Sequence, residues 1–241
     1  MKKIKLNKKC RLCSSKDLKK FINFGKIPLG NNLLKNFNLA KNADQFNLSV
    51  IQCNNCNHYQ LSHFVNKKIL YAKNYTYLTG IGRDFILHFK LYVKFVKKNY
   101  IKNLSNKKIL DVGSNDGTCL KNFKIYGSKV VGVDPATSAA KIANKNGIYT
   151  INSFFDSKTV DFLKKKYFEF DLITSHNVLA HVEDINFIFN NIFNLLKNNG
   201  YFIFEIGYFV DVVQNNYFDT VYHEHLDYHH CKPLVPFLNN L

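Results

Sequence analysis

The chain has 241 residues and 46% hydrophobic content, enough for one full domain and a smaller one with a buried core. Its formal net charge is +17, but only Arg11 and Arg83 are arginines, and the remaining positive charge is lysine scattered through an asparagine-rich sequence. Because arginine makes the bidentate contacts to phosphates and bases, this composition argues against a nucleic-acid partner.

Residues 1–9 are rich in lysine and no apolar stretch follows them, so the sequence predicts no signal peptide. No uncharged apolar run approaches the about 20 residues of a membrane span. We therefore expect a cytoplasmic protein with no membrane contact, whose cysteines are metal ligands or buried thiols rather than disulfides.

Residues 1–65 contain two Cys-x-x-Cys pairs, Cys10/Cys13 and Cys53/Cys56. Each pair can form a tight turn that presents two thiolates to one ion. Four thiolates suit a structural zinc ion and leave no open position for catalysis. We therefore expect a zinc-binding module, because a segment this small needs the metal to fold.

Two further expectations concern this module. His58 is surplus to a four-cysteine site, so we expect it on the protein surface. Residues 24–31 are rich in glycine, proline and asparagine, and we expect turns there.

Residues 66–105 are expected to form a helical connector that contributes to a substrate site. Residues 82–100 predict a helix with a broad apolar face. Tyr75 and Tyr77 lie in the loop before that helix.

The most informative stretch begins with an apolar run, 109–112, that ends in a loop reading Gly113-Ser114-Asn115-Asp116-Gly117. A second apolar run ends in Asp134. This order of strand, loop, helix, strand and acid predicts the opening of a nucleotide-binding α/β domain. The glycines allow a sharp exit from the strand and a helix that starts close to a ligand, and the Asp134 carboxylate can accept hydrogen bonds from two ribose hydroxyls.

The loop also indicates which nucleotide would bind. A pyrophosphate favours Gly-x-Gly-x-x-Gly at a helix N-terminus, but here the middle glycine is Asn115 and an acid, Asp116, follows it. A carboxylate opposes a pyrophosphate and suits a cationic ligand. We therefore favour S-adenosylmethionine, which carries a sulfonium and an ammonium, over NAD. An α/β domain with a turn and no ligand is the alternative.

The rest of the domain, which we place at 106–215, alternates regularly. Helices are expected at 117–126, 135–146, 157–167 and 184–197, and strands at 129–134, 148–151, 170–175 and 201–206. Asn177 and His181 follow the strand that ends at residue 175. Ligands bind at the carboxyl ends of strands in such sheets, so we expect Asn177 beside the cofactor.

A final segment, 216–241, carries Tyr222, Glu224 and His225 in a dense cluster of titratable residues. In a helix Tyr222 and His225 would share a face, whereas in an extended chain Tyr222 and Glu224 would. The sequence leaves this choice open.

Together, these motifs resemble the N-terminal part of the sugar C-methyltransferases that act on nucleotide-linked 4-keto-deoxysugars. The motifs that carry the resemblance are the four cysteines, the Gln60-Leu61 pair, Tyr75 and Tyr77, the loop 113–117, residues 132–136, Phe154-Phe155, residues 177–181, and residues 218–225. The resemblance implies a Rossmann-like S-adenosylmethionine-dependent methyltransferase domain that follows a zinc module.

The resemblance also implies roles for single residues. His225 would be the general base that removes the proton beside the sugar ketone, with Tyr222 and Glu224 next to it. Tyr77 and His181 would hold the sugar and stabilise the enolate. A histidine base suits neutral pH, and placed donors stabilise charge on the ketone oxygen. The alternatives are a capping role for His181, packing for Tyr77 and a structural hydrogen-bond cluster for the other three.

This chain departs from the family in length. The family continues with a second α/β domain that helps to bind the nucleotide-sugar, and we expect that domain to be absent from this chain. A separately encoded C-terminal domain is one possible partner. The competing functions are a zinc-ribbon RNA methyltransferase, a small-molecule O- or N-methyltransferase, and an inactive methyltransferase-like module. Structural roles are expected for the remaining candidates, which are His223, His229, His230, Cys119 and Cys231.

Overall fold

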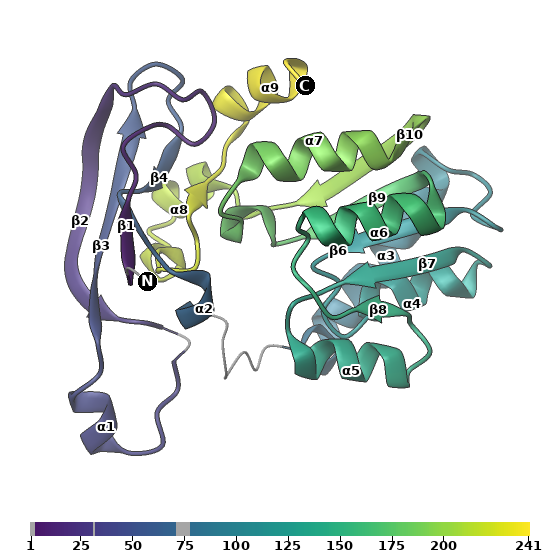
Figure 1. Ribbon diagram of the computed structural model, residues 1–241, viewed down its shortest axis with the longest axis horizontal. Coiled ribbons are helices and arrows are strands. Elements are labelled where there is room, and N and C mark those ends of the chain that lie inside the picture. The colour runs from purple at the N-terminus through teal and green to yellow at the C-terminus, as the bar shows by residue number, and fades with distance from the viewer. Residues whose placement is uncertain (1–2, 31, 71–77) are drawn as a thin grey trace. The chain divides into compact units, whose positions relative to one another are not determined.

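The computed structural model describes residues 3–30, 32–70 and 78–241. The chain divides into two compact units, shown as ribbons in Figure 1. Unit 1 comprises Met1–Tyr75, Leu179–Asn186 and Ile206–Leu241, and unit 2 comprises Thr76–Val178 and Phe187–Glu205.

Unit 2 is built on a parallel sheet of five strands in the order β10-β9-β6-β7-β8. Its elements are η1 (Thr79–Ile81), α3 (Arg83–Asn99), β6 (Lys108–Val112), α4 (Thr118–Ile125), β7 (Lys129–Val133), α5 (Thr137–Lys145), β8 (Thr150–Ile151), α6 (Ser157–Tyr167), β9 (Phe170–His176), α7 (Ile185–Leu195) and β10 (Leu196–Glu205). The predicted α/β domain with a parallel sheet is confirmed.

The strand order reverses beside β6: the chain moves outward through β7 and β8, and then returns to place β9 on the other side of β6. The carboxyl ends of β6 and β9 therefore flank the point at which the connections diverge to opposite sides. This is where open α/β sheets bind ligands.

Helices cover both faces of this sheet, with α3 and α4 on one face and α6 and α7 on the other (Figure 1). Phe89 and Val96 of α3 and Phe123 of α4 pack with Ile109 of β6 in one buried cluster. The central strands β6 and β9 are buried along almost their whole length, as expected where helices cover both faces of a parallel sheet.

Unit 1 is built on an antiparallel sheet of order β11-β4-β3-β2 and a separate β1–β5 pair. Its elements are β1 (Ile4–Leu6), β2 (Leu18–Pro28), α1 (Phe37–Lys41), β3 (Gln45–Cys53), β4 (Tyr59–Leu61), β5 (His63–Val65), α2 (Lys67–Leu70), η2 (Leu179–His181), α8 (Phe209–Gln214), η3 (Phe218–Thr220), β11 (Asp227–Tyr228) and α9 (Cys231–Asn239). The C-terminal segment therefore belongs to the same unit as the cysteine motifs: β11 pairs with β4, and Phe209 and Val212 of α8 pack against Leu48 and Val50 of β3.

The expectation of turns at 24–31 is wrong for residues 24–28, which continue strand β2 alongside β3. Gly25 has φ +77 and lies at a register shift, so a β-bulge, and not a chain reversal, uses this glycine. Cross-strand pairing with the apolar strand β3 fixes an extended conformation that local turn propensity did not predict.

No helix in the described part of the chain is both long and apolar enough to cross a membrane.

Gly113 is a tightly packed backbone position of unit 2 with a left-handed φ, and its substitution tests that packing. Its φ is +79, and an added Cβ would overlap Cγ2 of Val178. Gly147 also has a left-handed φ, +76, but its nearest neighbour would be the flexible Lys124 Nζ at 3.5 Å. We expect Gly113→Ala to lower the free energy of unfolding by about 2–4 kcal/mol, from left-handed strain plus overpacking, and Gly147→Ala by about 1 kcal/mol.

Urea unfolding of unit 2, followed by circular dichroism, measures both changes. Equal effects for the two variants would contradict a close approach of Val178 to Gly113.

Candidate functional site

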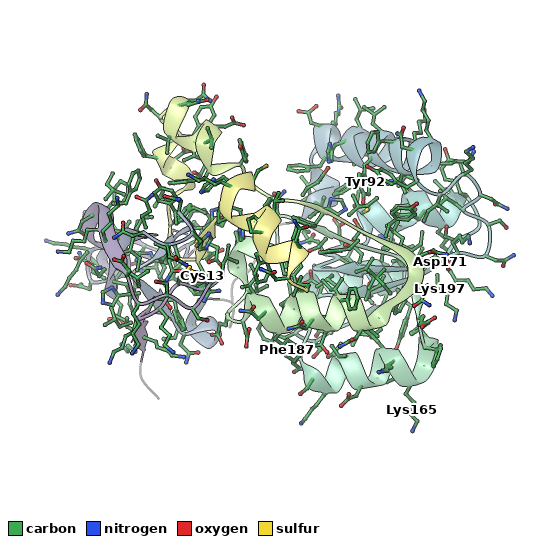
Figure 2. The ribbon with its side chains drawn as sticks, turned by 90° about the horizontal axis from the view of Figure 1, so that it is seen from above. Cys13, Tyr92, Lys165, Asp171, Phe187 and Lys197 are labelled. Carbon is green, nitrogen blue, oxygen red and sulfur yellow. The ribbon has the colours of Figure 1, made fainter. Side chains whose placement is uncertain are left out.

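The four predicted zinc ligands come together in unit 1, at two turns. Sγ of Cys10 lies 3.5 Å from Sγ of Cys56, and Sγ of Cys13 lies 3.6 Å from Sγ of Cys53. All four sulfur atoms lie within 4.8 Å of one another. Figure 2 labels Cys13 on the first turn.

These distances fit a zinc ion. In a regular tetrahedron with Zn–S bonds of about 2.3 Å, the sulfur atoms would be about 3.8 Å apart. The turns also supply donors, since Nδ2 of Asn55 lies 3.6 Å from Sγ of Cys13. Four sulfur ligands complete the coordination, so the arrangement suits a structural ion and offers it no position for a substrate.

The predicted cofactor residues lie at the carboxyl ends of three adjacent strands of unit 2. The loop 113–117 follows β6, Asp134 follows β7 and Asn177 follows β9. Asn177 is exposed, has a left-handed φ of +55, and donates its N–H to the carbonyl of Glu205 at 2.8 Å. The sheet therefore brings these three positions to one edge.

Glycine permits the loop at both of its ends. Gly113 leaves β6 with φ +79 and donates its N–H to the carbonyl of Val133 at 2.8 Å. Gly117 also has φ +79, and an added Cβ would lie 3.0 Å from Ile148. Helix α4 starts directly after it, as the sequence predicted.

Two polar residues of the loop, Asn115 and Asp116, bind the backbone of η1, which approaches from the preceding segment. Oδ1 of Asn115 accepts the N–H of Thr79 at 3.0 Å, and Oδ2 of Asp116 accepts the N–H of Gly80 at 2.7 Å. Asp116 also accepts the hydroxyl of Thr118 at 2.6 Å. The carboxylate that we expected to favour a cationic ligand thus also fixes the loop.

Asp134 anchors the loop from the second strand. Its Oδ2 accepts the N–H of Asn115 and its Oδ1 accepts the N–H of Ala136, both at 2.8 Å. Burial raises the pKa of Asp134, whereas these two N–H donors oppose the rise. Each carboxylate oxygen has a second lone pair, so the side chain can also accept hydroxyl groups of a ligand.

The predicted proton-transfer residues lie in unit 1, where a turn joins Tyr222 to His225. The N–H of His225 donates to the carbonyl of Tyr222 at 3.1 Å, which brings the two side chains to the same side. Nε2 of His225 lies 3.0 Å from the Tyr222 hydroxyl, and Nδ1 lies 2.8 Å from the carbonyl of Thr220. The structure therefore selects the Tyr222–His225 pairing.

These contacts determine the chemistry of the His225 ring. A carbonyl can only accept, so Nδ1 carries the proton and Nε2 presents a lone pair to the Tyr222 hydroxyl. Burial lowers the pKa of His225, and the bond to Thr220 opposes this. Burial, together with nearby Glu224, raises the pKa of Tyr222 to about 12. At neutral pH the pair is a neutral imidazole base and a neutral phenol.

Two other predicted residues adjoin this pair. The ring of His181 lies 4.8 Å from that of His225, edge to face, and Glu224 is buried. Tyr75 and Tyr77 lie outside the described residues, so the predicted role of Tyr77 stays a prediction.

The expectation for His58 is wrong. Its side chain is 0% exposed, and its Nε2 lies 2.9 Å from Oδ1 of Asp227, which is also buried. Asp227 also accepts a hydrogen bond from Arg11 Nε at 2.8 Å. Burial alone would raise the pKa of Asp227, but Arg11 and His58 hold it well below its usual range. No local pattern predicted this network, because its members are far apart in the sequence.

A second network of hydrogen-bonded polar side chains, in unit 2, was also not predicted. Oε2 of Glu205 lies 2.8 Å from Nδ1 of His176 and 2.9 Å from Nε2 of His88. Thr174 connects His176 to the hydroxyl of Tyr92, which Figure 2 labels, through contacts of 2.8 and 2.7 Å. Burial opposes ionisation of Glu205, but its two histidine partners lower its pKa.

Two protein-family models match this chain. Residues 10–71 match a family model described as "Putative zinc binding domain", and residues 87–237 match one described as "Methyltransferase domain". The C-methyltransferase NovU of Streptomyces niveus is 32% identical over 219 residues, which cover 91% of this chain and 52% of that protein.

Two further relatives are more distant. The ubiquinone biosynthesis O-methyltransferase of Pasteurella multocida is 31% identical over 112 residues, 42% of this chain and 46% of that protein. The YcgJ protein of Bacillus subtilis is a solved structure with 16% identity and a TM-score of 0.48, covering 64% of this chain and 67% of that one. The chain spans about half the length of the curated relatives it matches.

The cysteine cluster predicts that unit 1 depends on zinc. Cys13 and Cys231 are both exposed cysteines of unit 1, but only Cys13 belongs to the cluster. We expect Cys13→Ser to abolish stoichiometric zinc binding and to unfold unit 1, because structural zinc contributes about 10–16 kcal/mol in small zinc peptides. Cys231→Ser should change neither property.

Metal content by mass spectrometry and amide chemical-shift dispersion by NMR measure the two effects. A zinc-free unit 1 that keeps its full dispersion would contradict a structural role for the metal.

Proposed function

The chain belongs to the methyltransferase domain family, and from this premise we propose that it methylates a carbon atom with S-adenosylmethionine as the methyl donor. The proposed acceptor is the carbon beside the ketone of a nucleotide-linked 4-keto-deoxysugar. One observation carries the proposal best: His225 is held with its Nε2 lone pair directed at the hydroxyl of Tyr222. Removal of a proton from carbon needs an unprotonated base, and a neutral imidazole is one.

The loop 113–117, Asp134 and Asn177 would hold the cofactor. The carboxylate of Asp134 can accept hydrogen bonds from the two ribose hydroxyls, and the backbone N–H groups that already donate to it keep it in place. S-adenosylmethionine supplies an electrophilic methyl group when bound. The four cysteines would hold zinc away from the chemistry, because a closed thiolate site has no position for a substrate.

In this proposal Nε2 of His225 takes up the proton from the carbon beside the ketone. The Thr220 carbonyl fixes the tautomer and stabilises the imidazolium that forms. The Tyr222 hydroxyl, with its raised pKa, stays protonated and can donate to the enolate oxygen. His181, whose ring packs on that of His225, is the second candidate donor.

The name of the C-methyltransferase relative supports transfer to carbon, and the resemblance of the motifs supports the sugar substrate. Because the chain spans about half of that relative, we propose that polypeptide beyond these residues, such as a separately encoded C-terminal domain, contributes to binding the nucleotide-sugar.

The cofactor assignment predicts the behaviour of Asp134. We expect Asp134→Asn to weaken binding of S-adenosylhomocysteine at least about tenfold, because two hydrogen bonds to a charged acceptor are lost or weakened. Asp161→Asn, an exposed acid on α6 in the same unit, should bind like the wild type. Isothermal titration calorimetry measures both, and equal affinities would exclude Asp134 from the cofactor site.

The base assignment predicts the behaviour of His225. We expect His225→Gln to lower the rate of methyl transfer by about 10²–10⁴-fold and to stop deuterium exchange at the carbon beside the ketone, because glutamine cannot accept that proton. His63→Gln, a half-buried histidine of the same unit, is the control. Mass spectrometry measures both reactions on a panel of nucleotide-linked 4-keto-deoxysugars.

The base must be unprotonated to act, and burial lowers the pKa of His225 below its ordinary value of 6.5. Methyl transfer should therefore proceed above pH 6.5, and its rate should decline only as the pH falls below that value.

Methyl transfer that persists in His225→Gln would instead indicate methylation of oxygen or nitrogen.

A further inference from the structure

We propose that Arg11 is a positioning residue that couples the zinc site to the two histidines, His181 and His225. This inference rests on the proposed function of those histidines. Arg11 lies between the zinc ligands Cys10 and Cys13, inside the first cysteine turn. All of the groups that carry the inference belong to unit 1.

The backbone of Arg11 is fixed to the sheet. Its N–H donates to Oε1 of Gln60 at 2.8 Å, and Nε2 of Gln60 donates to the carbonyl of Lys9 at 2.9 Å. Gln60 is fully buried on β4, where its register partner across the sheet is Asp227. One amide side chain therefore holds the cysteine turn against the strand pair that carries Asp227.

The side chain of Arg11 reaches two other segments of the unit. Nε donates to Oδ1 of Asp227 at 2.8 Å, and one terminal nitrogen donates to the carbonyl of Glu183 at 3.0 Å. The other terminal nitrogen donates to the carbonyl of Val182. Only 8% of the side chain is exposed, so these hydrogen bonds are shielded from water.

These two segments carry the histidines. Val182 directly follows His181, and Asp227 lies two residues after His225. The backbone joins them again, because the N–H of Leu226 donates to the carbonyl of Ala180 at 2.6 Å. The ring of His181 then meets that of His225 at 4.8 Å. Arg11 thus binds the chain immediately beyond each member of the pair.

The contact requires arginine. The planar guanidinium directs its N–H groups at a carboxylate and two carbonyls at once, whereas a lysine ammonium offers donors from a single point. With Arg11 removed, Asp227 would remain buried beside His58, and the carbonyls of residues 182 and 183 would lose the hydrogen bonds from the guanidinium. The loop that carries His181 would then be free to shift relative to His225.

The test compares Arg11→Met, which keeps an unbranched apolar stem but removes every side-chain donor, with Arg83→Met. Arg83 is the only other arginine, is exposed and lies in unit 2, so it is a matched control. Zinc content is measured first, so that loss of metal is distinguished from loss of positioning. Arg11→Lys is the second variant and serves if the Met variant fails to fold.

The primary measurement is NMR of the zinc-loaded chain labelled with ¹⁵N at histidine. Wild type and Arg83→Met should show a His181–His225 ring contact in the nuclear Overhauser spectrum and a proton fixed on Nδ1 of His225. Arg11→Met should keep zinc and lose the ring contact, and Arg11→Lys should show a weakened one. A zinc-bound Arg11→Met with the wild-type contact and tautomer would overturn the proposal, as would absence of the contact from the wild type.

Methyl transfer provides the second measurement. In an active preparation we expect kcat of Arg11→Met to fall by about a hundredfold, the effect of a small misplacement of reacting groups, with the KM for S-adenosylmethionine unchanged. If Arg11→Met loses the ring contact but the wild type transfers no methyl group, the proposed function is refuted and the positioning role of Arg11 stands. An unchanged kcat together with a lost contact would refute the role of Arg11 in the reaction.

Discussion

The fold of unit 1 depends on the compensation of one buried charge. Asp227 has a fully buried side chain, and a carboxylate in that position is unfavourable unless hydrogen-bond donors and a positive charge meet it. Arg11 and His58 supply both, from positions more than 160 residues earlier in the sequence. The contacts of Arg11 and His58 with Asp227 therefore favour one arrangement of the unit, in which the cysteine turns and the C-terminal segment belong to one body.

In unit 2 the parallel sheet determines where the loops lie. Parallel strands place every loop that follows a strand at the same edge, so residues that are distant in sequence converge there. The loop 113–117, Asp134 and Asn177 meet in this way. Their polar atoms are also used internally, because Asp134 and Asp116 receive backbone N–H groups that hold the loop. A preformed loop loses less conformational entropy when a ligand binds.

The two units also divide the chemistry. The residues suited to a nucleotide lie in unit 2, and the imidazole–phenol pair and the thiolate cluster lie in unit 1. In unit 1 the second cysteine motif leads directly into β4, the strand that pairs with β11, so the cysteine cluster and the C-terminal segment share one sheet. In the proposed function, unit 2 would supply the site for the methyl donor and unit 1 would supply the base.

The sequence by itself determined most elements of unit 2 and the residue types of both sites, but residues 196–200, expected to end a helix, begin strand β10 instead. Apolar runs bounded by glycine and an acid fix strands and loops locally, and four cysteines in two close pairs leave few chemical alternatives to a metal. Only the tertiary structure decided that residues 24–28 are a strand, that His58 is buried, and that the Tyr222 hydroxyl contacts His225. The physical reason is the same in each case: cross-strand pairing, burial and hydrogen bonding to distant residues set these outcomes, and a local sequence pattern carries no information about a partner that is far along the chain.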